Sequence, residues 1–134
     1  MPFDFPDLPL GTDETGSEIT FESIHPNFEF HHLELIQQWV EQVVQLENGN
    51  LIALQYIFCD DDYLHQLNMT HLNHDTLTDI ITFPYEQFPN IHSDIFISVD
   101  RVRENAATFQ VSPENELHRV IIHGVLHLCG YPDK

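Results

Sequence analysis

Apolar residues recur along the chain with two different periods, and the change of period marks the expected elements. Alternating or continuous runs rich in β-branched and aromatic residues are typical of strands, whereas apolar residues spaced three and four apart are typical of amphipathic helices. These patterns predict strands at residues 19–25, 51–59, 79–83 and 92–98. They predict helices at residues 31–47, 60–67, 100–110 and 113–128, and a polar loop over residues 68–78.

The order of these elements predicts a single domain of the α/β (α+β) class. Strands and helices follow one another without an internal repeat or a low-complexity segment, which favours a mixed sheet of about four strands packed with helices. We place this domain at residues 19–134. Residues 1–18 are rich in Pro, Gly and acidic side chains, and we expect them to form a loose acidic N-terminal arm.

The charge of the chain limits its partners. There are 22 acidic residues against 4 Lys and Arg, a net charge of -18 with histidine neutral. This excludes a partner held mainly by counterion release from nucleic-acid phosphates, and no DNA partner is expected. An RNA substrate would be repelled at long range, so it would need a bound metal, a local basic spot or a helper protein.

Targeting signals and cysteines indicate the compartment. The N-terminus has neither the basic start nor the apolar block of a secretory signal, and no stretch approaches the ~20 apolar residues of a membrane span. Cys59 and Cys129 both lie in apolar segments, so we expect buried free thiols and a reducing compartment. We therefore expect a cytoplasmic protein with no membrane partner.

Two histidines near the end of the chain carry the strongest chemical signal. His123 and His127 are four residues apart in a predicted helix, so they lie on one face, one turn apart. Gly130 ends this helix and allows the chain to bring Asp133 towards the same ion. Three protein ligands with an open fourth position are typical of catalytic zinc. We expect one Zn²⁺ ion on His123, His127 and Asp133, at the end of the C-terminal helix.

A simpler interpretation of the same residues is a pair of surface histidines followed by a frayed terminal Asp133. The helix around His123 and His127 is otherwise apolar, however, and buried imidazoles need a shared partner. Gly124 inside the helix costs ~1 kcal/mol relative to Ala, so we expect another backbone or a substrate to approach it closely. Gly124 also replaces the general base of His-Glu-x-x-His zinc proteases, which argues against ordinary peptide hydrolysis.

The segment His-Gly-Val-Leu-His-Leu-Cys-Gly-Tyr at residues 123–131 resembles the signature of the YbeY family of metal-dependent endoribonucleases. Two further blocks are similar to the family and occur in its order. The first block consists of Leu67-Asn68, Asp75 and the run Thr-Asp-Ile-Ile-Thr-Phe-Pro at residues 78–84. The second block is Asp-Ile-Phe-Ile-Ser at residues 94–98. The resemblance covers roughly residues 33–133.

This resemblance implies a fold and an activity. It implies an α/β fold around the metal helix and a zinc-dependent cut in single-stranded RNA. It further implies a role in maturing the 3′ end of small-subunit ribosomal RNA and in ribosome quality control. The implied partners are single-stranded ribosomal RNA and the ribosome or its proteins, in the cytoplasm.

Two positions depart from the family pattern. Asp133 stands where the family usually has its third histidine, which keeps a metal site and shifts its preference towards harder ions. Leu72 stands where the family commonly has an Arg, which removes a phosphate contact that His74 replaces only in part because histidine is mostly neutral at pH 7.

Three further residues are candidates for catalysis. Glu116 shares the helix face of the two histidines, and Arg119 lies close to that face, one turn before His123. Arg119 is either a phosphate clamp or the partner of a neighbouring acid such as Glu116. Asp79 is either the general base or a structural hydrogen-bonding group near the metal helix. Asp94 and His118 are the other bases that the sequence offers.

These observations favour a zinc-dependent endoribonuclease and leave two alternatives. One is a zinc hydrolase of another class, such as a metallopeptidase that takes its base from another segment. The other is a non-enzymatic, ribosome-associated factor that keeps its metal for folding. A fourth metal position filled by protein instead of water would favour the second alternative.

Overall fold

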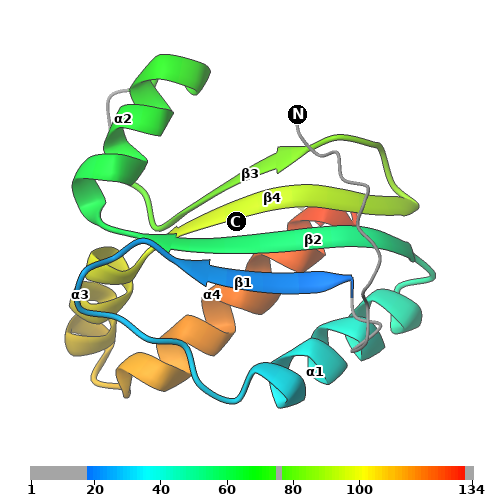
Figure 1. Ribbon diagram of the computed structural model, residues 1–134, viewed down its shortest axis with the longest axis horizontal. Coiled ribbons are helices and arrows are strands. Elements are labelled where there is room, and N and C mark those ends of the chain that lie inside the picture. Colours follow the sequence, from blue (N-terminus) through cyan, green and yellow to red (C-terminus); the bar gives the residue numbers. More distant parts are fainter. Residues whose placement is uncertain (1–17, 75–76, 132–134) are drawn as a thin grey trace.

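The expected order of strands and helices is confirmed in the computed structural model, which describes residues 18–74 and 77–131 (Figure 1). The expected N-terminal arm lies outside these residues apart from Glu18, as does Asp133. The elements are β1 (Ile19–Ser23), α1 (Leu33–Leu46), β2 (Asn50–Cys59), α2 (Asp61–Leu72), β3 (Ile80–Pro84), β4 (Asn90–Ser98), α3 (Val99–Phe109) and α4 (Pro113–Leu128).

The strands form one mixed sheet, which confirms the predicted fold class. Its order is β1-β2-β4-β3, with β1 at one edge and β3 at the other. β2 pairs in parallel with both β1 and β4, whereas β3 runs antiparallel to β4. The parallel register aligns Phe21 with Tyr56 and Tyr56 with Ile95, so these side chains share one face of the sheet.

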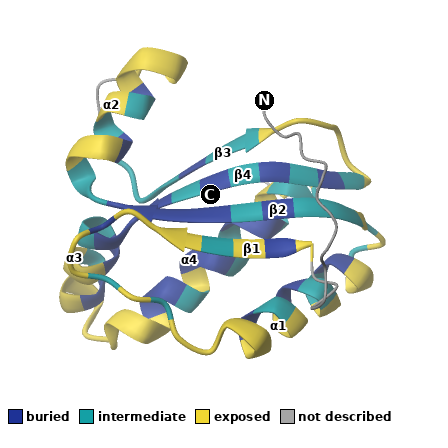
Figure 2. Ribbon diagram, viewed as in Figure 1, coloured by how far each residue is buried: buried dark blue, intermediate teal, exposed yellow. Residues whose placement is uncertain are grey.

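The main core lies between this face and three helices. Figure 1 shows α1, α3 and α4 together on one side of the sheet and α2 on the other. In α1 and α4 the buried apolar residues recur at helical spacing, and Figure 2 shows the buried stripes turned towards the sheet. The largest fully buried side chains of this core are Tyr56, Phe58, Ile19, Leu54, Ile91, Ile95, Ile97, Ile121, Val40, Val44 and Val120.

The predicted boundary of the second helix is wrong. The polar composition of residues 68–78 predicted a loop, but α2 continues through Leu72. Asn68 is buried, and its carbonyl oxygen accepts the N–H groups of Asn73 and His74, with Asn73 in the left-handed conformation at φ 58°. These bonds satisfy carbonyl groups at the end of the helix, so the helix extends over residues of low apolar content.

Close contact with the sheet explains the glycine inside α4. A Cβ atom at Gly124 would lie 2.8 Å from Cδ1 of Ile80 on β3, closer than such atoms pack. The sequence predicted that a backbone or a substrate approaches Gly124, whereas the atoms that do so belong to the side chains of Ile80 and Ile95 in the sheet. This approach brings the middle of α4 against the start of β3, next to Asp79.

Two other expectations can be compared with the structure. Cys59 and Cys129 are both free, Cys59 fully buried and Cys129 half-buried. No helix within residues 18–74 and 77–131 is long and apolar enough to cross a membrane.

Candidate metal centre

The two predicted ligands lie on the last two turns of α4. The helix begins where Ser112 Oγ accepts the N–H of Asn115 at 3.0 Å, with Pro113 in its first turn. His123 is half-buried and His127 is exposed, one turn apart on the same helix face. This spacing allows both imidazoles to reach a single ion.

The turn that ends α4 fixes the orientation of His127. Gly130, at φ 103°, donates its N–H to the carbonyl oxygen of His127 at 3.0 Å. Tyr131 donates its N–H to the carbonyl oxygen of Leu126, also at 3.0 Å. This turn brings the carbonyl oxygen of Tyr131 within 3.4 Å of Nδ1 of His127. A carbonyl oxygen only accepts hydrogen bonds, so this contact favours the tautomer of His127 that carries the hydrogen on Nδ1.

Three predicted catalytic residues lie together beside His123. The carboxylate of Glu116 accepts two hydrogen bonds from Arg119, from Nε at 3.0 Å and from Nη2 at 2.7 Å. Nη2 of Arg119 also lies 3.9 Å from Oδ2 of Asp79. The expected pairing of Arg119 with a neighbouring acid is therefore present, and the guanidinium group joins α4 to the residue before β3.

Burial changes the acidity of Asp79. The pKa of this carboxyl group is raised above its ordinary value, chiefly because burial disfavours the charged form. A backbone hydrogen bond and the positive charges of Arg119 and His123 oppose this rise. Asp79 thus holds a proton more readily than an exposed aspartate, next to the helix that carries the histidines.

The donor chemistry of the site fits a zinc ion in part. Imidazole nitrogens are common zinc ligands, and the hydrogen bond at Nδ1 of His127 is the usual support for a metal-binding histidine. Within the described residues no group of three or more His, Cys, Asp or Glu is placed to hold a metal. Asp133, the third predicted ligand, lies outside the described residues.

The other residues considered from the sequence lie elsewhere. Asp94 is opposite Phe83 in the β3–β4 pair and accepts a hydrogen bond from the hydroxyl of Tyr85 at 2.6 Å. Leu72, where the family pattern has an arginine, is the last residue of α2 and is exposed. Sequence reasoning missed the contact of Tyr131 with His127, although Gly130 in the family signature signalled a tight turn there.

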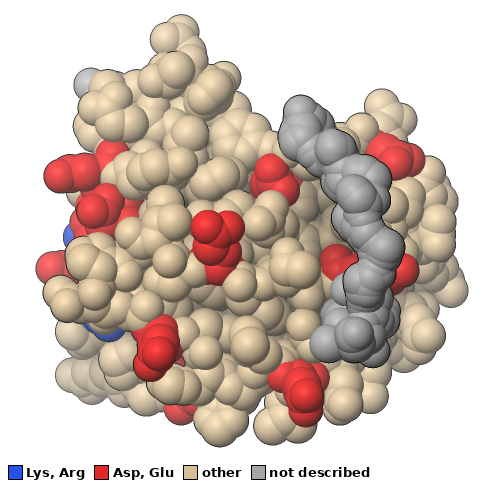
Figure 3. Space-filling view, viewed as in Figure 1, with Lys and Arg blue, Asp and Glu red and all other residues tan. Residues whose placement is uncertain are grey.

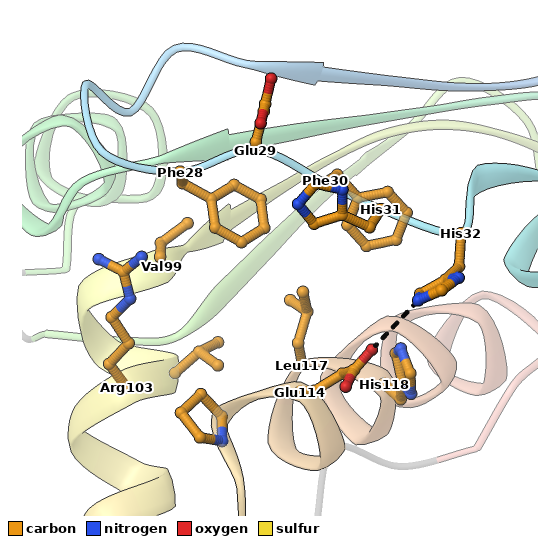
Figure 4. Close-up of a pocket in the computed structure, with 12 residues that line it drawn as sticks. Phe28, Glu29, Phe30, His31, His32, Val99, Arg103, Glu114, Leu117 and His118 are labelled. Carbon is orange, nitrogen blue, oxygen red and sulfur yellow. Dashed lines mark ion pairs between the residues drawn. The ribbon is translucent and has the colours of Figure 1, made fainter.

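A separate pocket of about 370 Å³ opens at the other end of α4, as Figure 4 shows. It lies between the segment after β1 and the first turns of α4, where His32 Nε2 is 3.9 Å from Glu114. His118 lines this pocket and contacts the edge of Trp39. The lining residues are Phe28, Glu29, Phe30, His31, His32, Val99, Val102, Arg103, Pro113, Glu114, Leu117 and His118.

Comparison with known proteins decides the family. A family model described as Endoribonuclease YbeY matches residues 18–134, which includes the histidine pair and the block around Asp79. The chain belongs to the YbeY endoribonuclease family. The family resemblance inferred from the sequence motifs is therefore confirmed.

Individual relatives and a solved structure agree with this assignment. Endoribonuclease YbeY of Flavobacterium psychrophilum is 53% identical over 108 residues, which cover 81% of this chain and 77% of the relative. Endoribonuclease YbeY of Flavobacterium johnsoniae is 50% identical over 107 residues, 80% of this chain and 77% of the relative. The solution structure of TM1509 from Thermotoga maritima superimposes with a TM-score of 0.60 at 30% identity, covering 87% of this chain and 75% of that one.

Proposed function

We propose that the chain is a single-strand-specific metallo-endoribonuclease that matures the 3′ end of small-subunit ribosomal RNA and acts in ribosome quality control. The observation that carries this proposal is the His123–His127 pair on one face of α4, in a chain of the YbeY family. The relatives at about half identity bear the name of an endoribonuclease. The ribosome and its RNA are the proposed partners, and the cytoplasm is the proposed compartment.

One zinc ion on His123, His127 and Asp133 is the proposed cofactor. When bound, it would neutralise phosphate charge and lower the pKa of water to about 7. This role matters for an acidic protein: Figure 3 shows Asp and Glu spread over the visible face, with Lys and Arg only near its left margin. The cation would supply attraction for a phosphodiester in a chain whose net charge is -18.

Arg119 and Glu116 have different proposed roles. Arg119 is half-exposed, and Glu116 holds its Nε and Nη2 atoms, which leaves Nη1 to contact a phosphate oxygen. Glu116 is only 2% exposed, so it acts by orienting Arg119 and does not touch the substrate.

Asp79 is the proposed general base. Its nearness to Arg119, at 3.9 Å, and the effect of the charge of His123 on its pKa support this role. Its raised pKa makes it a stronger base than an ordinary aspartate. It would take the proton of the water that attacks phosphorus, and the leaving ribose oxygen would be protonated from solvent.

The proposal is tested by metal content and cleavage in parallel. Purified protein is analysed for zinc and incubated with an end-labelled RNA carrying the 3′ end of small-subunit ribosomal RNA, free or annealed to its complement. We expect cleavage of the free strand only, and loss of zinc and cleavage in His123→Ala. The matched control is His118→Ala on the same helix, which should retain both because its side chain lines the separate pocket.

The outcomes separate the alternatives. Full RNA cleavage without metal would refute the zinc mechanism. Cleavage of peptides but not of RNA would assign the chain to another class of zinc hydrolase. Tight zinc binding without cleavage of either would favour the non-enzymatic ribosome-associated factor. A domain boundary at residues 18/19 is tested separately, since removal of residues 1–18 should leave cleavage intact.

A further inference from the structure

An exposed apolar stripe runs along α1, beside the face of this helix that packs on the sheet. Leu35, Trp39 and Leu46 are 64%, 37% and 80% exposed. Their spacing of four and then seven residues places them on one side of the helix. Single exposed apolar residues are ordinary on a protein surface, whereas a row of them that includes a tryptophan is typical of a contact surface.

This stripe continues into the pocket at the beginning of α4. The ring of His118 meets the ring of Trp39 edge-on, with 6.0 Å between their centroids, and His118 also lines the pocket of about 370 Å³. Figure 4 shows Phe28 and Phe30 on one side of this pocket and Leu117 on the other. The helices α1 and α4 therefore present one surface, with a row of apolar side chains and a hollow at one end.

The charges near this surface are mainly negative. Residues 1–100 contain no Lys or Arg, so α1 and the segment before it carry acids alone. Glu114 stands at the pocket, and Glu47 ends α1, where its Oε1 accepts a hydrogen bond from the hydroxyl of Tyr131 at 3.0 Å. Arg103 also lines the pocket, and its Nη2 donates a hydrogen bond to a backbone carbonyl oxygen at 2.9 Å. A second copy of the chain, with its net charge of -18, would be repelled here, whereas a basic segment would be attracted.

We propose that Leu35, Trp39 and Leu46, together with the pocket beside His118, form a docking surface for a basic amphipathic helix of a partner protein. Such a helix lays its apolar face along a hydrophobic surface through residues spaced three and four apart. Its Lys and Arg side chains would lie near the acids at the two ends of the stripe. The inference goes beyond the proposed nuclease activity and needs neither a metal nor cleavage.

Trp39 makes binding directly measurable, because it is the only tryptophan of the chain. The probe is a Leu/Lys peptide of about five helical turns, with Leu on one face and Lys elsewhere. One control peptide has the same composition with Leu spread around the helix, and a second has Glu in place of Lys. We expect the emission of Trp39 in the full chain to move to shorter wavelength and to saturate with the first peptide only. Added salt should weaken this binding.

Variants locate the binding on the docking surface. Leu35→Gln and Leu46→Gln should each weaken binding of the amphipathic peptide about tenfold, because each removes an apolar side chain that the peptide covers. Glu114→Gln should weaken it about threefold at low salt. The matched controls are Leu77→Gln, which changes an exposed leucine between α2 and β3, and Asp62→Asn on α2. Both should bind like the wild type, because α2 lies on the opposite side of the sheet (Figure 1). Circular dichroism verifies that each variant is folded.

Each other outcome overturns the proposal. Equal binding of the amphipathic peptide and its spread-leucine control would show attraction by charge alone, and unchanged binding in Leu35→Gln and Leu46→Gln would place the peptide elsewhere. A dimer in sedimentation velocity that Leu35→Gln dissociates would assign the surface to a second copy. A shift of Trp39 emission by single-stranded RNA that the same variants abolish would assign it to RNA. A peptide response that appears only after removal of residues 1–17 would assign it to that segment. Metal-free protein should bind the peptide equally well, so failure of the proposed nuclease mechanism leaves this result unaffected.

Discussion

The guanidinium group of Arg119 covers the carboxylate of Glu116 with two hydrogen bonds of 3.0 and 2.7 Å, one turn apart on α4. The two partners differ sharply in exposure, since the side chain of Glu116 is 2% exposed and that of Arg119 is 54% exposed. The free-energy cost of burial therefore falls on the carboxylate of Glu116, and the two hydrogen bonds from Arg119 offset this cost.

This asymmetry predicts unequal losses of stability. Arg119→Met should lower the free energy of unfolding by about 3 kcal/mol, because it leaves a buried carboxylate without a partner. Glu116→Gln should cost only about 1 kcal/mol, because the released guanidinium is already partly in water. Urea denaturation at pH 7 measures both. Equal losses, or a loss in Arg119→Met that does not shrink at acid pH, would contradict the assignment.

Gly124 and Ile80 should be energetically coupled. Gly124→Ala gains about 1 kcal/mol of helix propensity, but its new Cβ would lie 2.8 Å from Cδ1 of Ile80. Overpacking of this kind typically costs 1–3 kcal/mol, so we expect a net loss of about 1 kcal/mol. Ile80→Val removes the clashing methyl group, and a double-mutant cycle should show a favourable coupling of at least about 1 kcal/mol. If the changes in unfolding free energy of Gly124→Ala and Ile80→Val are additive, β3 moves away from α4 without cost and the two residues are not coupled.

Asp79 should make the metal-free protein less stable as the pH rises. Its pKa is raised in the folded state, so the folded chain binds the proton more tightly than the unfolded chain. The resulting stability is complete below the ordinary pKa of aspartate and is lost as the pH rises through the raised value. Asp79→Asn lacks this loss, so its stability relative to the wild type should increase as the pH rises from below the ordinary pKa of aspartate through the raised pKa of Asp79.

The control for this pH profile is Asp62→Asn, which removes one negative charge from an exposed position in the first turn of α2. General charge repulsion would affect both variants alike. A profile of Asp79→Asn that matches the control would show that burial does not hold a proton on Asp79.

The two free cysteines should differ in reactivity. Burial raises the pKa of the Cys59 thiol to about 12, whereas Cys129 is half-buried with a smaller rise caused by burial and by Glu47. Because the thiolate is the reactive form, an aromatic disulfide reagent at pH 8 should modify Cys129 first and Cys59 only on unfolding. Mass spectrometry of the two peptides checks this order, and equal rates would contradict it.

Hydrophobic periodicity was sufficient to predict the element order and the mixed sheet. The α4 helix was predicted from residue 113 to 128, as found, because Ser112, Pro113 and Gly130 mark its ends with local chemistry. The end of α2 was not predictable in the same way. It depends on the buried Asn68 and the left-handed Asn73, and their effect appears only when the helix packs on the sheet.

The candidate site was predictable only where its residues share one helix. His123, His127, Glu116 and Arg119 follow from spacing along α4, but spacing could not decide between a free and a paired Arg119. Asp79 was suspected from a motif, and its place beside Arg119 depends on how β3 meets α4. The contact of Glu47 with Tyr131 carries no sequence signal, because it joins two helix ends brought together by the sheet.

The topology of the sheet ties the candidate site to the whole domain. β4 pairs with β2 across about 40 residues, and α4 packs on β3 and β4. The surroundings of the two histidines therefore depend on contacts between segments that lie far apart in the sequence. A chain that has lost this sheet keeps the spacing of the histidines but not the neighbours of His123, so metal affinity should report the integrity of the whole domain.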